Sequence, residues 1–189
     1  LSSYLHFGQI SPLTIALNIQ QATADSTNKD AYLEELIVRR ELAFNQALFN
    51  PASHEYHGIP SWAQATLDAH RHDPRDYLYS RDEWEQAATH DPYWNAAQNQ
   101  LRQEGIIHNY MRMYWGKKLI EWSASPEEAF ETAVYLNNTY ALDGRDPNSW
   151  TGISWCFGTH DRPWTQRPVF GTVRYMNANG LKRKFKQIQ

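Results

Sequence analysis

The residues of this chain that could do chemistry are mainly aromatic. Its 189 residues include 8 Trp, 11 Tyr and 7 Phe. Trp115 and Trp122 lie seven positions apart on a predicted helix, so they share a face at a separation of about two turns, or roughly 10 Å. Trp94 precedes them on another predicted helix and could pack beside them. Such a group either belongs to the hydrophobic core or carries electrons to a redox cofactor, and spacing alone leaves both interpretations open.

Arg112 lies on the same predicted helix, among apolar and aromatic residues, and therefore needs a partner. Breaking a buried ion pair by removing one partner typically costs about 3–5 kcal/mol. Asp143, in the turn sequence Leu-Asp-Gly-Arg-Asp, is a candidate partner. The pair would be either a structural salt bridge or part of a ligand site.

Metal chemistry and the common forms of covalent catalysis have no sequence signature here. The eight histidines do not have the spacing of metal ligands, and Cys156 has no adjacent thiol for zinc and no cysteine-hydrolase motif. There is no glycine-rich phosphate loop and no serine-nucleophile elbow. We expect no metal site. An enzyme of this kind would depend on the chemistry of a bound cofactor.

The elements that must position these residues have helical patterns. Ser11-Pro12, the pair Ser80 and Glu83, and Ser125-Pro126 are start signals, and Gly105 is a stop signal. Beyond about Asp143, Asp-Gly, Asp-Pro, Arg-Pro and Asn-Gly steps predict turns and loops. We therefore predict an all-α fold with a loop-rich carboxyl-terminal third. The longest predicted helices cover residues 30–49, 92–104 and 106–122.

The net charge of -3 hides an asymmetry. All 21 acidic residues lie at or before Asp161. From Arg162 onward every charged residue is basic. This segment is either a solvated tail or a contact to the phosphate backbone of nucleic acid, and the latter would bind in a salt-dependent way. Its basic residues are Arg162, Arg167, Arg174, Lys182, Arg183, Lys184 and Lys186.

Several other classes of protein are excluded or disfavoured. A single cysteine excludes an internal disulfide framework and favours a reducing, intracellular compartment. No apolar run approaches the roughly 20 residues of a membrane span, and no secretory signal is visible. The length suits one domain over residues 1–189. Because Leu1 stands within sequence that has a structured pattern, we expect a fragment of a longer protein.

A set of short segments occurs in the order found in the DNA photolyase family and resembles its class II branch. Together they extend over essentially the whole chain, and the ordered set is far more specific than any single segment. The segments are residues 1–8, 32–45, 90–95, 108–118, 135–137 and 142–147, Trp155, and residues 174–176.

The resemblance implies an all-α domain that holds FAD, truncated at its amino end and separated from an α/β antenna domain of the same protein. In this family, light-excited reduced flavin donates an electron to a cyclobutane pyrimidine dimer in DNA, the ring opens, and the electron returns. The dimer must leave the duplex, and stacking of about 1–3 kcal/mol per base helps to hold it there. The implied partners are damaged DNA and the antenna domain; we expect a monomer that does not bind membranes.

The resemblance also implies roles for individual residues. Arg112 and Asp143 resemble the ion pair beside the flavin ring, and Asn137 resembles the asparagine that faces the flavin N5 position. Glu35 resembles the glutamate that contacts the dimer, and Arg174 the arginine that enters the gap in the duplex. The cofactor set is Ser2, Arg40, His108, Asn109, Arg112, Asn137, Asp143, Gly144 and Arg145. The DNA set is Glu35, Arg39, Met113, Trp155, Arg162 and Arg174. Trp94, Trp115 and Trp122 match the tryptophans that reduce the flavin, so with Asn137 and Glu35 they form the catalytic set.

The sequence departs from the class II pattern at two places and leaves two other functions open. Arg39 stands where some members have a tryptophan against the lesion, and the loop over residues 155–161 is one residue shorter than usual. The alternatives are a cryptochrome-like FAD photoreceptor and a non-catalytic helical module. Glu35, Trp155 and Arg174 favour repair, because a sensor has no need of lesion contacts.

Overall fold

The computed structural model describes residues 1–185 and confirms the all-α prediction. No strand occurs within that range; its one β-feature is an isolated bridge between Arg167 and Gly171. The helices, in chain order, are α1 (Ser2–His6), α2 (Pro12–Gln21), α3 (Ser26–Leu33), a π-helix (Glu34–Arg39), α4 (Arg40–Phe49), a 3-10 turn (Tyr56–Gly58), α5 (Ser61–Ala69), α6 (Arg81–Glu85), α7 (Pro92–Glu104), α8 (Asn109–Trp122), α9 (Pro126–Tyr140), α10 (Pro147–Cys156) and α11 (Ala178–Lys184).

The start and stop signals read from the sequence act as predicted. The Ser11 side chain accepts a hydrogen bond from the first turn of α2, and Ser125 does the same for α9. Ser80 and Glu83 form a reciprocal capping box at the start of α6. Gly105 ends α7 in the left-handed conformation, at φ 70°.

Two predicted boundaries are wrong, each for a local reason. The helix predicted over residues 30–49 belongs to a continuous helical stretch that begins at Ser26. This stretch contains the π-helix, whose wider turn a 3.6-residue pattern cannot reveal. The helix predicted over residues 106–122 begins only at Asn109, because the His108 side chain caps it by accepting from the Tyr110 N–H.

The carboxyl-terminal third is only partly the loop region that was predicted. Residues 157–177 contain no helix, as predicted. The segments before and after them, which were also predicted to be loops, contain α10 and α11. The Asp146-Pro147 step was read as a turn, whereas Asp146 caps α10 and Pro147 occupies its first turn. The Asn179-Gly180 step was also read as a turn, but it lies within α11, which Asn177 caps.

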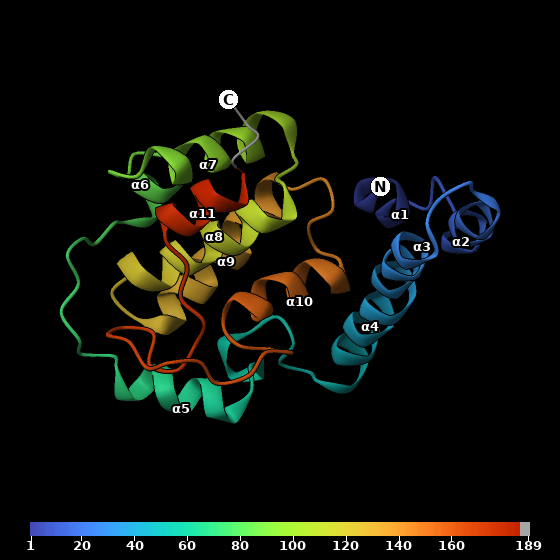
Figure 1. The fold of residues 1–189 in the computed structure, drawn as a ribbon. Helices are drawn as coiled ribbons and strands as arrows, with labels where there is room; N and C mark the ends of the chain where they lie inside the picture. Colours follow the sequence, from blue (N-terminus) through green and yellow to red (C-terminus); the bar gives the residue numbers. More distant parts are fainter. Residues whose placement is uncertain (186–189) are drawn as a thin grey trace.

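The molecule has two parts, which we call the arm (residues 1–50) and the body (residues 51–185). Figure 1 shows the arm, α1 to α4, lying to one side of the remaining helices, and α4 packs against α10. The arm buries only Ile15, Leu36 and Ala43. The hydrophobic core lies entirely in the body.

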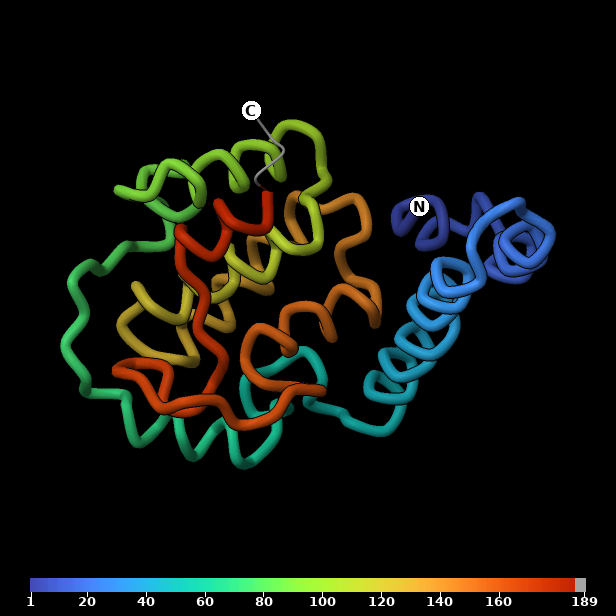
Figure 2. Tube along the Cα trace, in the orientation of Figure 1, coloured from blue at the N-terminus to red at the C-terminus, as the bar shows by residue number. Residues whose placement is uncertain are grey.

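Helix α8 is the central element of the body. It packs against α7, α9 and α10, and the trace in Figure 2 shows it passing through the interior. Gly116 permits the close approach of α10, because a Cβ there would lie 2.5 Å from the Cys156 sulfur. Burial lowers the pKa of Lys117 to about 8, and its ammonium group donates to the Cys156 carbonyl. From Tyr114 to Ile120 every residue of α8 is buried, which fits the aromatic-rich sequence of this segment.

Membrane insertion finds no support in the described part of the chain. None of its helices combines the length and the apolar character needed to span a bilayer.

Candidate functional site

A cavity of about 510 Å³ lies where the arm meets the body. Its volume falls in the range of about 300–1,000 Å³ that is typical of small-molecule and cofactor sites. Helices α1, α4 and the π-helix provide one wall, and α8, α10 and the loop between α9 and α10 provide the other. It is lined by Ser2, Leu5, His6, Tyr32, Glu35, Leu36, Arg39, Arg40, Ala43, Ile107, Asn109, Arg112, Asp143, Asp146, Asn148, Ser149, Thr151, Gly152 and Trp155.

Many of the residues predicted to bind a cofactor or a lesion meet at this cavity. They come from five separate segments of the sequence, so their convergence is a property of the fold. From the predicted sets, the lining includes Ser2, Glu35, Arg39, Arg40, Asn109, Arg112, Asp143 and Trp155.

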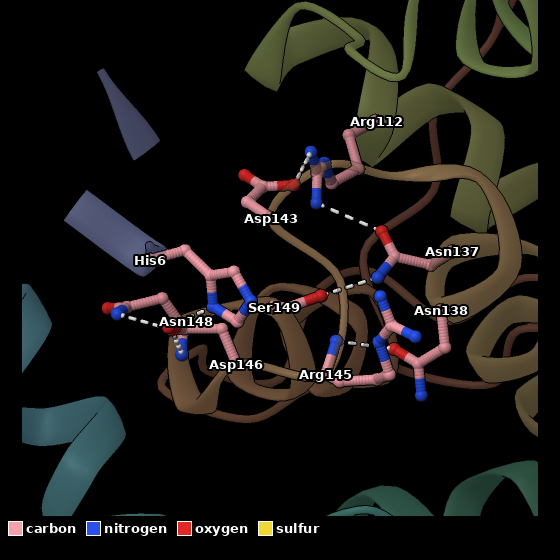
Figure 3. A network of polar contacts seen from close by, with 9 residues as sticks. All are labelled: His6, Arg112, Asn137, Asn138, Asp143, Arg145, Asp146, Asn148 and Ser149. Atoms are coloured by element: carbon pink, nitrogen blue, oxygen red, sulfur yellow. Dashed lines mark hydrogen bonds and ion pairs between the residues drawn. The ribbon is translucent and has the colours of Figure 1, made fainter. Parts of the chain in front are cut away.

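The Arg112–Asp143 pair exists and belongs to a larger polar network (Figure 3). An Arg112 terminal nitrogen lies 3.4 Å from Asp143 Oδ1, and the other donates to Asn137 Oδ1 at 3.0 Å. The Asn137 amide nitrogen donates in turn to the Ser149 hydroxyl. Both ends of the buried Asn137 amide are thus engaged, which fixes its orientation. The pair is therefore both a structural bridge and part of the cavity wall.

A second pair joins the two parts of the molecule across the cavity. His6 Nδ1 on α1 lies 3.0 Å from Asp146 Oδ2, which also caps α10 (Figure 3). Burial raises the pKa of Asp146, but hydrogen bonds from His6 and Asn148 outweigh this effect and leave the pKa below its ordinary value. Sequence reasoning missed His6, Asn148 and Ser149. The Asp-Pro helix-start signal before α10 could have located Asp146.

The π-helix shapes the arm's wall of the cavity. It carries Glu35 and Arg39, and π-helical turns within α-helices are frequent at functional sites. Arg39 Nε lies 2.9 Å from a Glu34 carboxylate oxygen, and its guanidinium lies 5.1 Å from the centre of the Trp155 ring. The wall opposite Trp155 is therefore cationic, as the departure at residue 39 predicted.

The other predicted residues lie near the cavity without lining it. His108 caps α8, and its ring packs edge-on against Phe185. Gly144 allows its loop to pass close to α9, since a Cβ there would lie 2.9 Å from the Asn137 carbonyl oxygen. The Arg145 backbone N–H donates to the Asn138 side chain. Met113 faces α10, with its sulfur 3.8 Å from that of Cys156.

The predicted DNA-contacting arginines of the basic segment gather around one exposed ring. The guanidinium groups of Arg174 and Arg162 lie 4.9 Å and 5.7 Å from the centre of Trp164, which is 41% exposed. Sequence reasoning missed Trp164, although an aromatic residue two positions after Arg162 was a visible signal. Lys186 of the basic segment lies outside the described residues.

The three predicted tryptophans are buried and close together, so they are part of the core. The rings of Trp94 and Trp115 stack at 6.2 Å with an interplanar angle of 7°. Trp94 Nε1 donates to the Trp115 carbonyl, and Trp115 Nε1 donates to the Gln98 side chain. Trp115 follows Arg112 by one helical turn, so this end of the group is close to the cavity. Core packing does not exclude electron transfer, and both interpretations remain compatible with the geometry.

Metal binding finds no support among residues 1–185, where no three His, Cys, Asp or Glu side chains come together as metal ligands do. The cavity instead offers three arginines, several amides and hydroxyls, and one indole. Such a set suits an anionic or planar organic molecule, because guanidinium groups bind phosphates and stack on rings.

Comparison with curated proteins gives close matches over nearly the whole chain. A deoxyribodipyrimidine photo-lyase of Methanothermobacter thermautotrophicus is 54% identical over 186 residues, which are 98% of this chain and 41% of that protein. That of Oryza sativa subsp. japonica is 49% identical, covering 98% of this chain and 37% of the relative. That of Arabidopsis thaliana is 46% identical, covering 98% of this chain and 38% of the relative. The chain thus spans about two fifths of the length of these relatives. No family model matches it.

Proposed function

We infer from its membership of the deoxyribodipyrimidine photo-lyase family that this chain forms the part of such an enzyme that holds FAD and receives damaged DNA. The observation that carries the proposal is the convergence of Ser2, Arg40, Asn109, Arg112 and Asp143 on one cavity of suitable size. Because the chain spans only part of its relatives, the repair activity belongs to the proposal.

The residues of the cavity fit FAD. Arg40 and Ser2 supply a cation and a hydroxyl for its phosphates, at the arm's wall. The Arg112–Asp143 pair would hold the flavin ring at the body's wall, and the fixed amide of Asn137 would face its N5 position. When bound in its reduced form and excited by light, FAD supplies the electron that opens the pyrimidine dimer.

The extruded pyrimidine dimer would enter from the side of the cavity that carries Glu35, Arg39 and Trp155. An indole and a guanidinium can both stack on an extruded base, and Glu35 can accept hydrogen bonds from its polar edge. Arg162 and Arg174, held around Trp164, would contact the DNA backbone and the gap left in the duplex. Met113 would support the lesion side through its contact with α10.

The remaining part of the protein would cover the arm. Large apolar side chains are exposed there, and the relatives have more than half of their length outside the matched region. We assign this covering role to the rest of the same polypeptide, including the antenna domain. The proposed protein is an intracellular monomer. The exposed residues include Leu13, Leu17, Leu48 and Phe49.

The decisive experiment is an absorption spectrum followed by a repair assay on the full-length protein. We expect a flavin spectrum after purification, and light-dependent loss of thymine dimers from DNA once the flavin is reduced. A flavin spectrum without dimer reversal would support a photoreceptor instead, and absence of flavin would support a non-catalytic helical module. Arg174→Ala should weaken DNA binding and lower its salt dependence by about one counterion.

A further inference from the structure

Trp84 is a fourth tryptophan in the interior of the body, and none of the assignments above uses it. It lies on α6 and is fully buried. Its ring centre is 4.7 Å from that of Trp94 and 6.2 Å from that of Trp122, to which it is nearly parallel at 9°. Trp84 therefore stands between Trp94 and Trp122.

With Trp84 included, four indole rings form a continuous row. The row runs from Trp115 through Trp94 and Trp84 to Trp122, with consecutive ring centres 6.2, 4.7 and 6.2 Å apart. Trp115 and Trp122 lie two turns apart on α8, so α6 and α7 supply the two rings that fill the interval. The rate of electron transfer falls steeply with distance, and Trp84 offers two steps of 4.7 and 6.2 Å between ring centres on the way from Trp94 to Trp122.

The indole N–H of Trp84 differs from those of Trp94 and Trp115. Its indole N–H is buried and has no hydrogen-bond acceptor within residues 1–185, whereas those of Trp94 and Trp115 are both bonded. Leaving a buried donor unsatisfied destabilises the fold, and a phenylalanine at this position would carry no such donor. An indole is, however, far easier to oxidise by one electron than a phenyl ring.

The same unsatisfied N–H suits a relay. An oxidised indole becomes a radical cation, which is trapped when it releases its N–H proton to a nearby base. Trp84 has no such acceptor among the described residues, so its radical cation keeps the proton and can be refilled by the next ring. The row also ends close to charge: the Lys118 ammonium lies 5.0 Å from the Trp122 ring and is paired with Glu121.

We propose that Trp84 is an electron relay between Trp94 and Trp122 during photoreduction of the flavin. The inference rests on the proposed function. Trp115 would give one electron to the light-excited oxidised flavin and be left with an electron hole. Trp94, Trp84 and Trp122 would each then pass one electron toward Trp115, so that the hole moves to Trp122. An external thiol or another one-electron reductant finally refills Trp122. No bond is made or broken, and one electron leaves each ring for each that it receives.

The test is time-resolved absorption of indole radicals in the flavin-loaded protein, with Trp84→Phe as the main variant. We expect the radical to recombine earlier and the yield of photoreduction to fall by at least about tenfold. Repair by chemically pre-reduced protein should be unchanged. Trp62→Phe on α5 is the matched control and should behave as the wild type. An unchanged radical lifetime and yield in Trp84→Phe would overturn the inference.

A second variant keeps the test valid if Trp84→Phe does not fold. The Trp94 and Trp115 rings are parallel within 7°, and the Trp84 ring is inclined at 58° to that of Trp94. In Trp122→Phe, an electron hole that moves from Trp94 to Trp84 enters a ring of different orientation. It must therefore rotate the polarisation of the radical absorption signal. Absence of that rotation would mean that Trp84 is not oxidised, and the inference would be wrong.

Failure of the proposed function gives a different result. In that case the wild type would bind no flavin, or would not photoreduce it. If the wild type photoreduces its flavin and Trp115→Phe abolishes this, the flavin-binding part of the proposed function stands. The repair assay then tests the rest of that function, and the effect of Trp84→Phe on photoreduction tests the inference separately. Near-ultraviolet circular dichroism of the flavin-free protein provides a further readout, because loss of the stacked Trp84–Trp122 pair should change the aromatic spectrum.

Discussion

The arm and the body differ sharply in how much of their own sequence they bury. Helices α7, α8 and α9 bury apolar side chains on several turns, and every residue of α8 from Tyr114 to Ile120 is buried. A larger share of the arm is helical, yet the arm buries only three residues and exposes large apolar side chains. The body is therefore stabilised by its own hydrophobic core, whereas the stability of the arm depends on its contacts with other parts of the protein.

The cavity takes one wall from each part, so its two walls are held with different strength. The body's wall is a closed network of Arg112, Asp143, Asn137 and Ser149. The arm's wall is held by α4 against α10 and by the His6–Asp146 pair. We conclude that the body provides a rigid half of the site and that the arm provides an adjustable half.

The largest expected contrast comes from truncating one leucine in each part. Leu119→Ala removes a fully buried side chain of α8 and should lower the free energy of unfolding by about 2–5 kcal/mol. Leu48→Ala, at a position of α4 that is 73% exposed, should change it by less than about 0.5 kcal/mol. Urea denaturation followed by circular dichroism measures both. Comparable losses would show that the arm is as well packed as the body.

The same contrast explains what the sequence could and could not predict about the fold. Capping residues at Ser80, Ser125 and Gly105 act locally, so they predicted helix ends correctly. The π-helix and α10 were missed for different reasons. A 3.6-residue pattern cannot reveal the wider turn of a π-helix, and α10 depends on its packing against α4 and α8. A turn dipeptide such as Asp-Pro cannot by itself distinguish a loop from a helix start.

The site shows a similar limit. Arg112 and Asp143 could be paired from sequence, because a buried cation requires an anion. His6 and Asp146 are 140 positions apart, and nothing local connects them. Trp84 was equally invisible, because α6 is too short to show a periodic pattern and its ring meets the others only through the fold.

The joint between arm and body should be sensitive to a single methyl group. A Cβ at Gly58 would lie 1.9 Å from the Ala52 carbonyl oxygen, and the Gly58 carbonyl also accepts from the Asn50 side chain. Gly58→Ala should therefore destabilise the protein by about 1–3 kcal/mol and expose the joint to proteolysis. Gly180→Ala is the control, since its Cβ would make an ordinary contact at 3.5 Å. Equal protease resistance in the two variants would contradict this account of the joint.

Within the body's wall, Asp143→Asn should weaken both the fold and cofactor retention. The Arg112 side chain is 13% exposed, so its charge would lose its anionic partner in a largely buried place. We expect a loss of about 1–2 kcal/mol, between the values for exposed and buried pairs, and less flavin after purification. Asp76→Asn, at an exposed position of the body, is the matched control. Full flavin content in Asp143→Asn would place the ion pair outside the binding site.

Asp146→Asn is the corresponding change at the contact between body and arm, and we expect the smallest effect, below about 1 kcal/mol at neutral pH. Because the folded state lowers the pKa of Asp146, its contribution is present above the ordinary carboxyl pKa near 4 and is lost as the pH falls through the folded pKa. The stability difference between wild type and variant should therefore be seen at pH 7 and disappear once the pH lies below the folded pKa of Asp146. Hydrogen exchange should locate that difference in α1 and the start of α10. A difference that persisted in acid would mean that Asp146 acts through packing, and that its charge does not hold the arm to the body.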